Sequence, residues 1–158
     1  SGYLRDLVDW LSTMMDSALV LLPKTVKDTI LTSCFMHISN RLLNSALLDR
    51  HVRMINLAAL CELESDVTFL YQYGKSLHEP DIDNVVGQIR PTLGVILSAS
   101  VSEYALSQQA RTQKFPQVQP VKVAAILDKL CQGYAHLGMP ELSLKCKREY
   151  ELVMRLNL

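Results

Sequence analysis

The fold class is decided by residues 3–11, Y-L-R-D-L-V-D-W-L, whose apolar positions recur with the period of a helix. The pattern continues to residue 22. The apolar side chains that share one face are Leu4, Leu7, Val8, Leu11, Met15, Ala18, Leu19 and Leu22. At 1.5 Å per residue, such a helix would be about 30 Å long. The sequence therefore predicts a long amphipathic helix that buries this face against a neighbour.

Pro23 is expected to end this first helix, because proline in a helix interior costs about 3 kcal/mol and pushes its predecessor toward an extended conformation. A second helix is predicted after it, with an apolar residue every four positions. The predicted buried stripe consists of Val26, Ile30, Cys34, Ile38, Leu42 and Ala46. Two long helices joined by one short turn are expected to pack antiparallel.

Helical spacing continues along the rest of the chain, with several predicted breaks. Residues 52–61 predict a third helix. Glu64-Ser65-Asp66 predicts the start of a fourth, because serine caps exposed amides and carboxylates favour a helix N-terminus. A kink or two shorter helices are expected around Pro91. Residues 108–119 lack amphipathic order and predict the longest irregular connection.

Two further helices are predicted near the end of the chain. One begins at Pro120, and the last begins at Pro140 after a Gly138-Met139 turn, with Leu142, Cys146, Tyr150, Val153 and Met154 facing inward. Almost no segment alternates apolar and polar residues as a strand does. The predicted fold class is therefore all-α, an elongated antiparallel bundle of about six to eight helices.

Length and composition favour a folded helical protein. A chain of 158 residues buries about 70% of its unfolded surface. The hydrophobic fraction of 49% is ordinary, and no apolar run approaches the roughly 20 residues of a membrane span. We expect residues 1–80 to form a first bundle, with residues 81–158 packed against it or continuing it.

Charge excludes a global attraction to nucleic acid, because 16 basic and 16 acidic residues cancel. The basic cluster Lys145, Lys147 and Arg148 is interpreted as a solvated helix face, with a phosphate or lipid contact as the alternative. The 4 cysteines are far apart and lack a metal-binding spacing, so reduced core thiols are predicted. No metal site or cofactor is predicted.

Catalytic motifs are missing from the sequence. There is no P-loop, no H-E-x-x-H and no dinucleotide-binding fingerprint. Adjacent polar pairs such as Asp128 with Lys129 point about 100° apart on a helix and do not converge. We therefore predict a protein that is not an enzyme and has no catalytic residues.

Four patches, in this order and spacing, resemble the C-terminal region of the Sec-fifteen subunit of the exocyst, the complex that tethers secretory vesicles to the plasma membrane. Together they extend the resemblance over nearly all of the chain. The patches are Y-L-R-D-L-V-D-W-L at residues 3–11, L-P-K-T-V at 22–26 followed by H-I-S-N-R-L-L, L-E-S-D-V at 63–67, and K-F-P-Q-V-Q-P at 114–120 with I-L-D-K-L at 126–130.

This resemblance implies an all-helical rod segment of a tethering complex. It also implies a partner, a Rab-family GTPase in its GTP form, together with other exocyst subunits. The protein would be cytoplasmic and recruited to secretory vesicles and to sites of exocytosis at the plasma membrane. Its membrane association would be indirect, through partners and without a transmembrane segment. A third interpretation is that this region binds only other exocyst subunits and makes no contact with a GTPase.

The third patch supplies the candidate partner-binding residues. Leu63, Glu64 and Ser65 stand where animal members have phenylalanine, asparagine and leucine, which suggests a divergent member, such as a fungal one. Glu64, Ser65 and Asp66 are expected at an exposed helix junction. Tyr73 is added because it lies off the apolar stripe of its helix and tyrosine is favoured in interface centres. The alternative is that Ser65 and Asp66 only cap a helix.

A tetratricopeptide-like, peptide-binding scaffold is the other candidate function. Residues 133–138, G-Y-A-H-L-G, followed by P-E-L at 140–142, are similar to part of one such helix pair. A stable array needs about three pairs. No second copy occurs at the 34-residue period of this repeat, which favours the tethering interpretation.

Overall fold

The computed structural model describes residues 2–42, 47–87 and 89–157. Within these ranges the chain forms helices and no strand, which confirms the predicted all-α class. These ranges hold nine α-helices, more than predicted, because α4, α6 and α7 are short. The elements are α1 (Gly2–Asp16), α2 (Lys24–Arg41), α3 (Leu57–Ser76), α4 (Ile82–Val85), α5 (Ile89–Leu97), α6 (Val101–Leu106), α7 (Gln108–Gln113), α8 (Pro120–His136), α9 (Pro140–Met154) and a final 3-10 turn, η2 (Arg155–Asn157).

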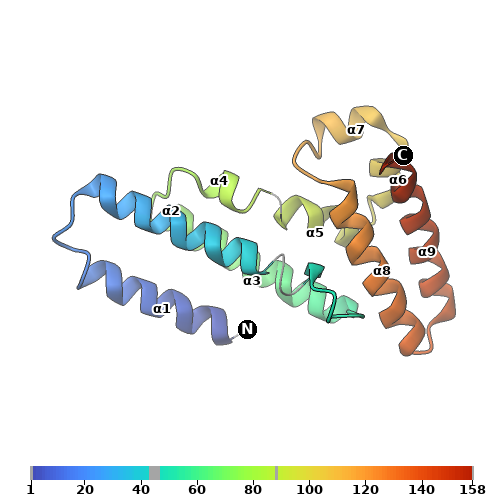
Figure 1. Ribbon diagram of the computed structural model, residues 1–158, viewed down its shortest axis with the longest axis horizontal. Coiled ribbons are helices and arrows are strands. Elements are labelled where there is room, and N and C mark those ends of the chain that lie inside the picture. The colour runs from blue at the N-terminus through green and yellow to red at the C-terminus, as the bar shows by residue number, and fades with distance from the viewer. Residues whose placement is uncertain (1, 43–46, 88, 158) are drawn as a thin grey trace.

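The molecule is elongated, as Figure 1 shows. Helices α1, α2 and α3 run along its long axis, and the α8–α9 hairpin crosses one end. Helices α1 and α2 are antiparallel neighbours joined by the turn before Pro23, as the sequence predicts. The outer sides of these long helices therefore form long surfaces along one half of the molecule.

Helix α1 confirms the predicted amphipathic stripe as far as Met15, whereas Ala18, Leu19 and Leu22 lie beyond the helix and Ala18 is exposed. The stripe residues that pack into the core are Leu4, Leu7, Val8, Leu11 and Met15. The helix ends at Asp16, earlier than predicted. Ser17 Oγ donates a hydrogen bond of 2.6 Å to the Thr13 carbonyl oxygen. Such side-chain bonds to the backbone compete with helix continuation, and residues 17–22 form turns.

The buried face of helix α2 is offset from the predicted one. Its buried side chains are Leu31, Phe35 and Ser39. Ile38 and Leu42 of the predicted stripe are partly buried and pack against the core. Val26 is 42% exposed, and Ala46 lies outside the described residues. Apolar residues occur all around this helix, so its neighbours α1, α3 and α4 decide which face is buried. The four-residue pattern alone could not identify that face.

Helix α3 runs without a break, so the predicted junction at Glu64-Ser65-Asp66 is wrong. The Asn56 side chain caps its start by accepting a hydrogen bond of 2.7 Å from the Ala59 amide. One buried stripe passes through the predicted junction and consists of Leu60, Leu63, Val67, Leu70 and Gly74. Burial of this stripe outweighs the weak helix preference of serine and aspartate.

Two short helices, α4 and α5, occupy the region around Pro91, as predicted. Pro91 lies in the first turn of α5, where its missing N–H leaves no helical hydrogen bond unmade. Residues from both sides of the predicted boundary at residue 80 contribute to one central core. The division of the chain into residues 1–80 and 81–158 stays a prediction. That core consists of Leu47, Leu60, Leu63, Val67, Ile89, Leu93, Ile126, Leu130 and Cys146.

The segment 108–119 is only partly irregular, because α7 occupies its first half. Ser107 Oγ caps α7 by accepting a hydrogen bond of 3.1 Å from the Ala110 amide. Arg111 Nη1 donates to the Tyr104 and Ala105 carbonyl oxygens at 2.9 and 2.8 Å and so satisfies the end of α6. These capping hydrogen bonds stabilise α7, and they leave no amphipathic pattern in the sequence. The predicted irregular segment therefore contains a helix that the pattern did not indicate.

The α8–α9 hairpin begins and turns where the sequence predicts. Gly138 has a φ of 69°, a conformation that glycine adopts readily and that reverses the chain here. Cys146 and Val153 are buried as expected. Leu142 and Met154 are 42% and 40% exposed, so their predicted inward position is wrong. One side of α9 contacts no other described helix, and that side stays open to solvent.

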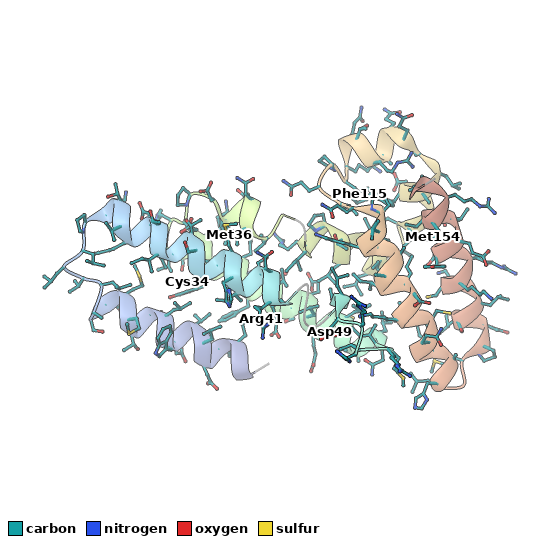
Figure 2. The ribbon with its side chains drawn as sticks, in the orientation of Figure 1. Cys34, Met36, Arg41, Asp49, Phe115 and Met154 are labelled. Carbon is teal, nitrogen blue, oxygen red and sulfur yellow. The ribbon has the colours of Figure 1, made fainter. Side chains whose placement is uncertain are left out.

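The loop before α3 is fastened to α8 at Lys129. Lys129 Nζ donates a hydrogen bond of 2.7 Å to the Asp49 carbonyl oxygen, and the Lys129 carbonyl accepts one of 3.1 Å from the Ile55 amide. Figure 2 shows Asp49 on this loop beside α8. Burial lowers the pKa of the Lys129 ammonium. The loop and α8 thus form one unit, although they are far apart in sequence.

Candidate partner-binding site

The structure brings three of the four predicted contact residues together. Glu64, Ser65 and Asp66 lie on one turn in the interior of α3, and all three line a hollow of about 310 Å³ between α1 and α3. Glu64 and Ser65 are exposed, and Asp66 is half-buried. The other residues of this hollow, called the α1–α3 hollow below, are Arg5, Thr68, Phe69 and Gln72.

The α1–α3 hollow combines charge with an aromatic surface. The Arg5 guanidinium lies 5.9 Å from the centre of the Phe69 ring, a cation–π distance. Thr68 Oγ1 donates a hydrogen bond of 3.0 Å to Glu64 Oε1. Arginine and aromatic side chains are enriched in protein interfaces, where they supply much of the binding energy. The hollow therefore has the chemistry of a protein-binding surface.

A second hollow, of about 560 Å³, lies on the other side of Glu64, between α3 and α5. Its lining residues are Glu64, Arg90, Pro91, Gly94, Leu97 and Ser98. Glu64 therefore stands on a ridge between two hollows, with one arginine in each. Sequence reasoning missed Arg5, Arg90 and Pro91, because only the packing of α1 and α5 against α3 brings them to Glu64.

A polar cluster continues this surface along α3. Tyr71 Oη and Lys75 Nζ each donate a hydrogen bond of 2.9 Å to the Asp83 carboxylate. The Lys75 hydrogen bond, followed by that of Tyr71, lowers the pKa of Asp83, and the same contact raises the pKa of Lys75. The Arg90 guanidinium lies 4.2 Å from the centre of the Tyr71 ring. Tyr71 thus links Arg90 to α4.

Tyr73, the fourth predicted residue, lies outside both hollows. It is half-buried, and its hydroxyl lies 2.7 Å from Ser12 Oγ on α1. Its ring packs 6.0 Å from that of Phe35 on α2. Tyr73 therefore joins α1, α2 and α3, and its contacts hold the helix that carries Arg5.

In the part of the chain that the structure describes, no group of three or more histidine, cysteine or acidic side chains could hold a metal ion. None of the helices in that part is long and apolar enough to cross a bilayer. All four cysteines are free thiols, of which Cys61 is exposed and Cys146 is buried.

The rate of alkylation is expected to differ between these thiols. Burial, with a smaller effect of Glu149, raises the pKa of Cys146 to about 11. At pH 8, about one Cys146 thiol in a thousand is then the reactive thiolate. Cys61 should react with iodoacetamide at least about 100-fold faster than Cys146, measured by mass spectrometry of quenched samples. In denaturant the four rates should converge. Equal rates in the folded protein would contradict the burial of Cys146.

Comparison with known proteins shows the family of the chain. A family model described as exocyst complex subunit Sec15 C-terminal matches residues 1–129. The exocyst complex component sec15 of Schizosaccharomyces pombe is 25% identical over 137 residues. That alignment covers 85% of this chain and 18% of the relative, so the chain spans a small part of the relative's length. No solved structure matches. The family match includes every residue of the two hollows beside Glu64, and the chain belongs to the Sec15 family of exocyst subunits, as a C-terminal region.

Proposed function

We propose that this chain is a partner-binding part of a vesicle-tethering exocyst subunit. We further propose that Glu64 and the two hollows beside it, called the α3 surface below, bind a Rab-family GTPase in its GTP form. Family membership supports the tethering role. The observation that carries the GTPase contact is the position of Glu64 between two hollows, each with one arginine. The activity is recognition, with no chemical step.

Recognition of the nucleotide state follows from rigidity. A GTPase orders its switch regions only when the γ-phosphate is present. Helix α3 is continuous and its inner stripe is buried, so its outer surface offers one fixed arrangement of charges. A fixed surface that fits the ordered switches binds the GTP form more tightly. A tenfold preference corresponds to about 1.4 kcal/mol.

The predicted residues have different parts in this proposal. Glu64, Ser65 and Asp66 contact the partner, since they line the α1–α3 hollow. Tyr73 is a positioning residue, because its hydroxyl contacts Ser12 and keeps α1 against α3. Arg5 joins the contact set because it lines the same hollow.

The cellular setting follows from the same proposal. The protein acts in the cytoplasm, and the GTPase recruits it to secretory vesicles and to sites of exocytosis. Its association with membranes is indirect. Other exocyst subunits bind the same subunit, and family membership supports them as partners.

Replacing Glu64 with arginine should weaken binding of the GTP form by about tenfold or more, because the ridge then carries a positive charge between two arginines. The measurement is calorimetric titration of the purified chain with a panel of Rab GTPases, each loaded with a non-hydrolysable GTP analogue or with GDP. Glu62→Arg is the matched control, since Glu62 is exposed on α3 but lines neither hollow.

Circular dichroism of both variants should show unchanged helicity, because both positions are exposed. Equal loss of binding in Glu62→Arg and Glu64→Arg would remove the proposed role of the ridge. If the chain binds the analogue-loaded form of no GTPase in the panel more tightly than its GDP form, the proposed GTPase contact is wrong. The surface would then be assigned to other exocyst subunits.

A further inference from the structure

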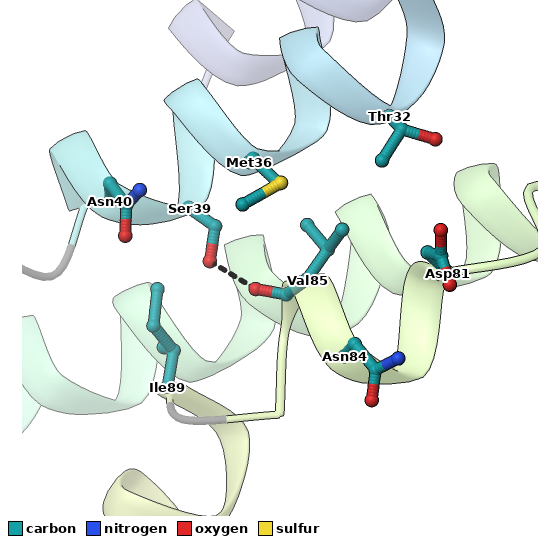
Figure 3. A pocket seen from close by; sticks show the side chains of 8 residues that line it. All are labelled: Thr32, Met36, Ser39, Asn40, Asp81, Asn84, Val85 and Ile89. Atoms are coloured by element: carbon teal, nitrogen blue, oxygen red, sulfur yellow. Dashed lines mark hydrogen bonds between the residues drawn. The ribbon is translucent and has the colours of Figure 1, made fainter. Parts of the chain in front are cut away.

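Besides the two hollows beside Glu64, a hollow of about 330 Å³ lies between α2 and α4, and Figure 3 shows the side chains around it. The buried Ser39 hydroxyl donates a hydrogen bond of 2.7 Å to the Val85 carbonyl oxygen there and joins the two helices. Among the described residues that line this hollow, Asp81 alone is charged. The side chains that favour a particular ligand lie elsewhere, on the loop before α3.

Two exposed arginines without ion pairs lie on this loop, residues 49–56, called the arginine loop below. Arg50 and Arg53 form no ion pair and no side-chain hydrogen bond with any residue of the described ranges. His51 is exposed between them. A guanidinium carries five N–H donors in a planar fork that matches a carboxylate or a phosphate. Both forks are therefore open to an anionic ligand.

The arginine loop is fixed to α8 at both ends. At its start, the Asp49 carbonyl oxygen accepts a hydrogen bond of 2.7 Å from Lys129 Nζ. Near its end, the Ile55 amide donates one of 3.1 Å to the Lys129 carbonyl oxygen, and the Ile55 carbonyl oxygen would clash with a Cβ atom at Gly133. The two arginines lie between these fixed points, so binding a ligand would order little additional backbone.

The charge around the arginine loop is net positive. Burial lowers the pKa of Lys129, and the nearby carboxylates of Asp49 and Asp128 oppose that shift. The first turn of α3, which follows the loop, contains no acidic residue. Lys129 and the two arginines therefore stand against two carboxylates, and the surplus is carried by the exposed arginines. A negatively charged partner is attracted to this part of the surface.

Exposed apolar side chains lie beside the arginines. Met54 and Leu57 are 47% and 43% exposed, and Leu137, one helical turn beyond Gly133 on the same side of α8, is 54% exposed. Arginine and methionine are both enriched in protein interfaces. A lipid surface is usually recognised by clusters of about four to eight lysines or arginines, more than this loop carries. The composition therefore favours a protein partner over a membrane.

We propose that the arginine loop binds an acidic segment of a partner protein. Arg50 and Arg53 each pair with one carboxylate of that segment, and an apolar side chain next to the carboxylates contacts Met54 and Leu57. No residue of the loop lines either hollow beside Glu64, so this surface and the α3 surface can bind different partners.

Titration with a short acidic peptide, acetyl-E-L-E-E-L-amide, followed by NMR of the isotope-labelled chain, tests this proposal. Saturable shifts are expected at the backbone amides of Arg50, Arg53, Met54 and Leu57. The same peptide with glutamine in place of each glutamate should bind at least about tenfold more weakly, because charge-assisted pairs become neutral contacts. Equal binding of the two peptides, or scattered shifts that do not saturate, would overturn the proposal.

Sedimentation measurements distinguish the other possible occupants. With phosphatidylserine vesicles the chain should stay in the supernatant, because the loop has too few cationic side chains for stable membrane binding. Cosedimentation that Arg53→Gln abolishes would assign the loop to a membrane, and a dimer that the same substitution abolishes would assign it to a second copy of this chain. Either result would overturn the proposal.

A variant pair locates the charge. Arg53→Gln should raise the dissociation constant of the acidic peptide about fivefold, because one of two charge pairs is lost. Arg148→Gln is the matched control and should leave the constant unchanged, since Arg148 is exposed on α9 and forms no ion pair with a described residue. Equal effects of the two variants would contradict a local site. No GTPase takes part in these measurements, so failure here leaves the proposed function untouched.

Discussion

Replacing Gly133 with alanine is expected to lower the free energy of unfolding by about 3 kcal/mol. A Cβ atom at Gly133 would lie 2.0 Å from the Ile55 carbonyl oxygen, and no real contact is that short. The obstructing atom belongs to the backbone, so the loop before α3 must move away from α8. That movement breaks the hydrogen bonds of Lys129 to Ile55 and Asp49.

Urea denaturation followed by circular dichroism measures this effect, and Gly94→Ala on α5 is the matched control. A Cβ atom at Gly94 would meet nothing within 4 Å. Alanine also restricts the unfolded chain, so the control should gain about 0.5–1 kcal/mol. Opposite signs for the two substitutions are therefore expected. Equal stability of the two variants would show that the loop does not pack on α8 as described.

Phe35→Ala is expected to cost about 3–5 kcal/mol, since a fully buried aromatic side chain leaves a cavity when it is truncated. Phe35 is 0% exposed, on the face of α2 that meets α1 and α3. Its ring contacts that of Tyr73. The loss should therefore also loosen α1, and with it Arg5.

The same denaturation experiment tests Phe35, with Met36→Ala as its control. Met36 is the next residue of α2 and is 50% exposed, so its truncation should change stability by less than about 1 kcal/mol. A similar, small loss at both positions would contradict the observed orientation of α2.

Much of the fold could be predicted from local signals. Helix α1 has a single apolar face, and that face is the buried one. Prolines at the first turn of α8 and α9 mark both starts, because their position in a helix is physically restricted. The two short helices around Pro91 were predicted for the same reason, because proline is restricted to the first turn of a helix. These signals depend on residues close together in the sequence.

Features decided by distant contacts could not be predicted. Glu64-Ser65-Asp66 has the composition of a helix start, yet α3 continues because the buried stripe on its other face does not end there. Apolar residues occur on every side of α2, so its buried face depends on its neighbours α1, α3 and α4. Helix α7 forms through the Ser107 cap without an amphipathic pattern.

The candidate site was predicted in part for the same reason. Glu64, Ser65 and Asp66 are near each other in sequence, and they line one hollow. Arg5 and Arg90 reach that surface from α1 and α5, and nothing in the local sequence relates them to α3. Tyr73 lies off the buried stripe of α3, but α1 covers that part of the helix.

Hydrogen–deuterium exchange of the chain, alone and with a Rab GTPase that binds it, tests the central claim most directly. With the GTP-analogue form, added protection is expected in residues 57–76 and 89–98, where the ridge and its hollows lie. With the GDP form, these segments should exchange as in the free chain. Protection confined to α8 and α9, or the same protection in both nucleotide states, would contradict the claim.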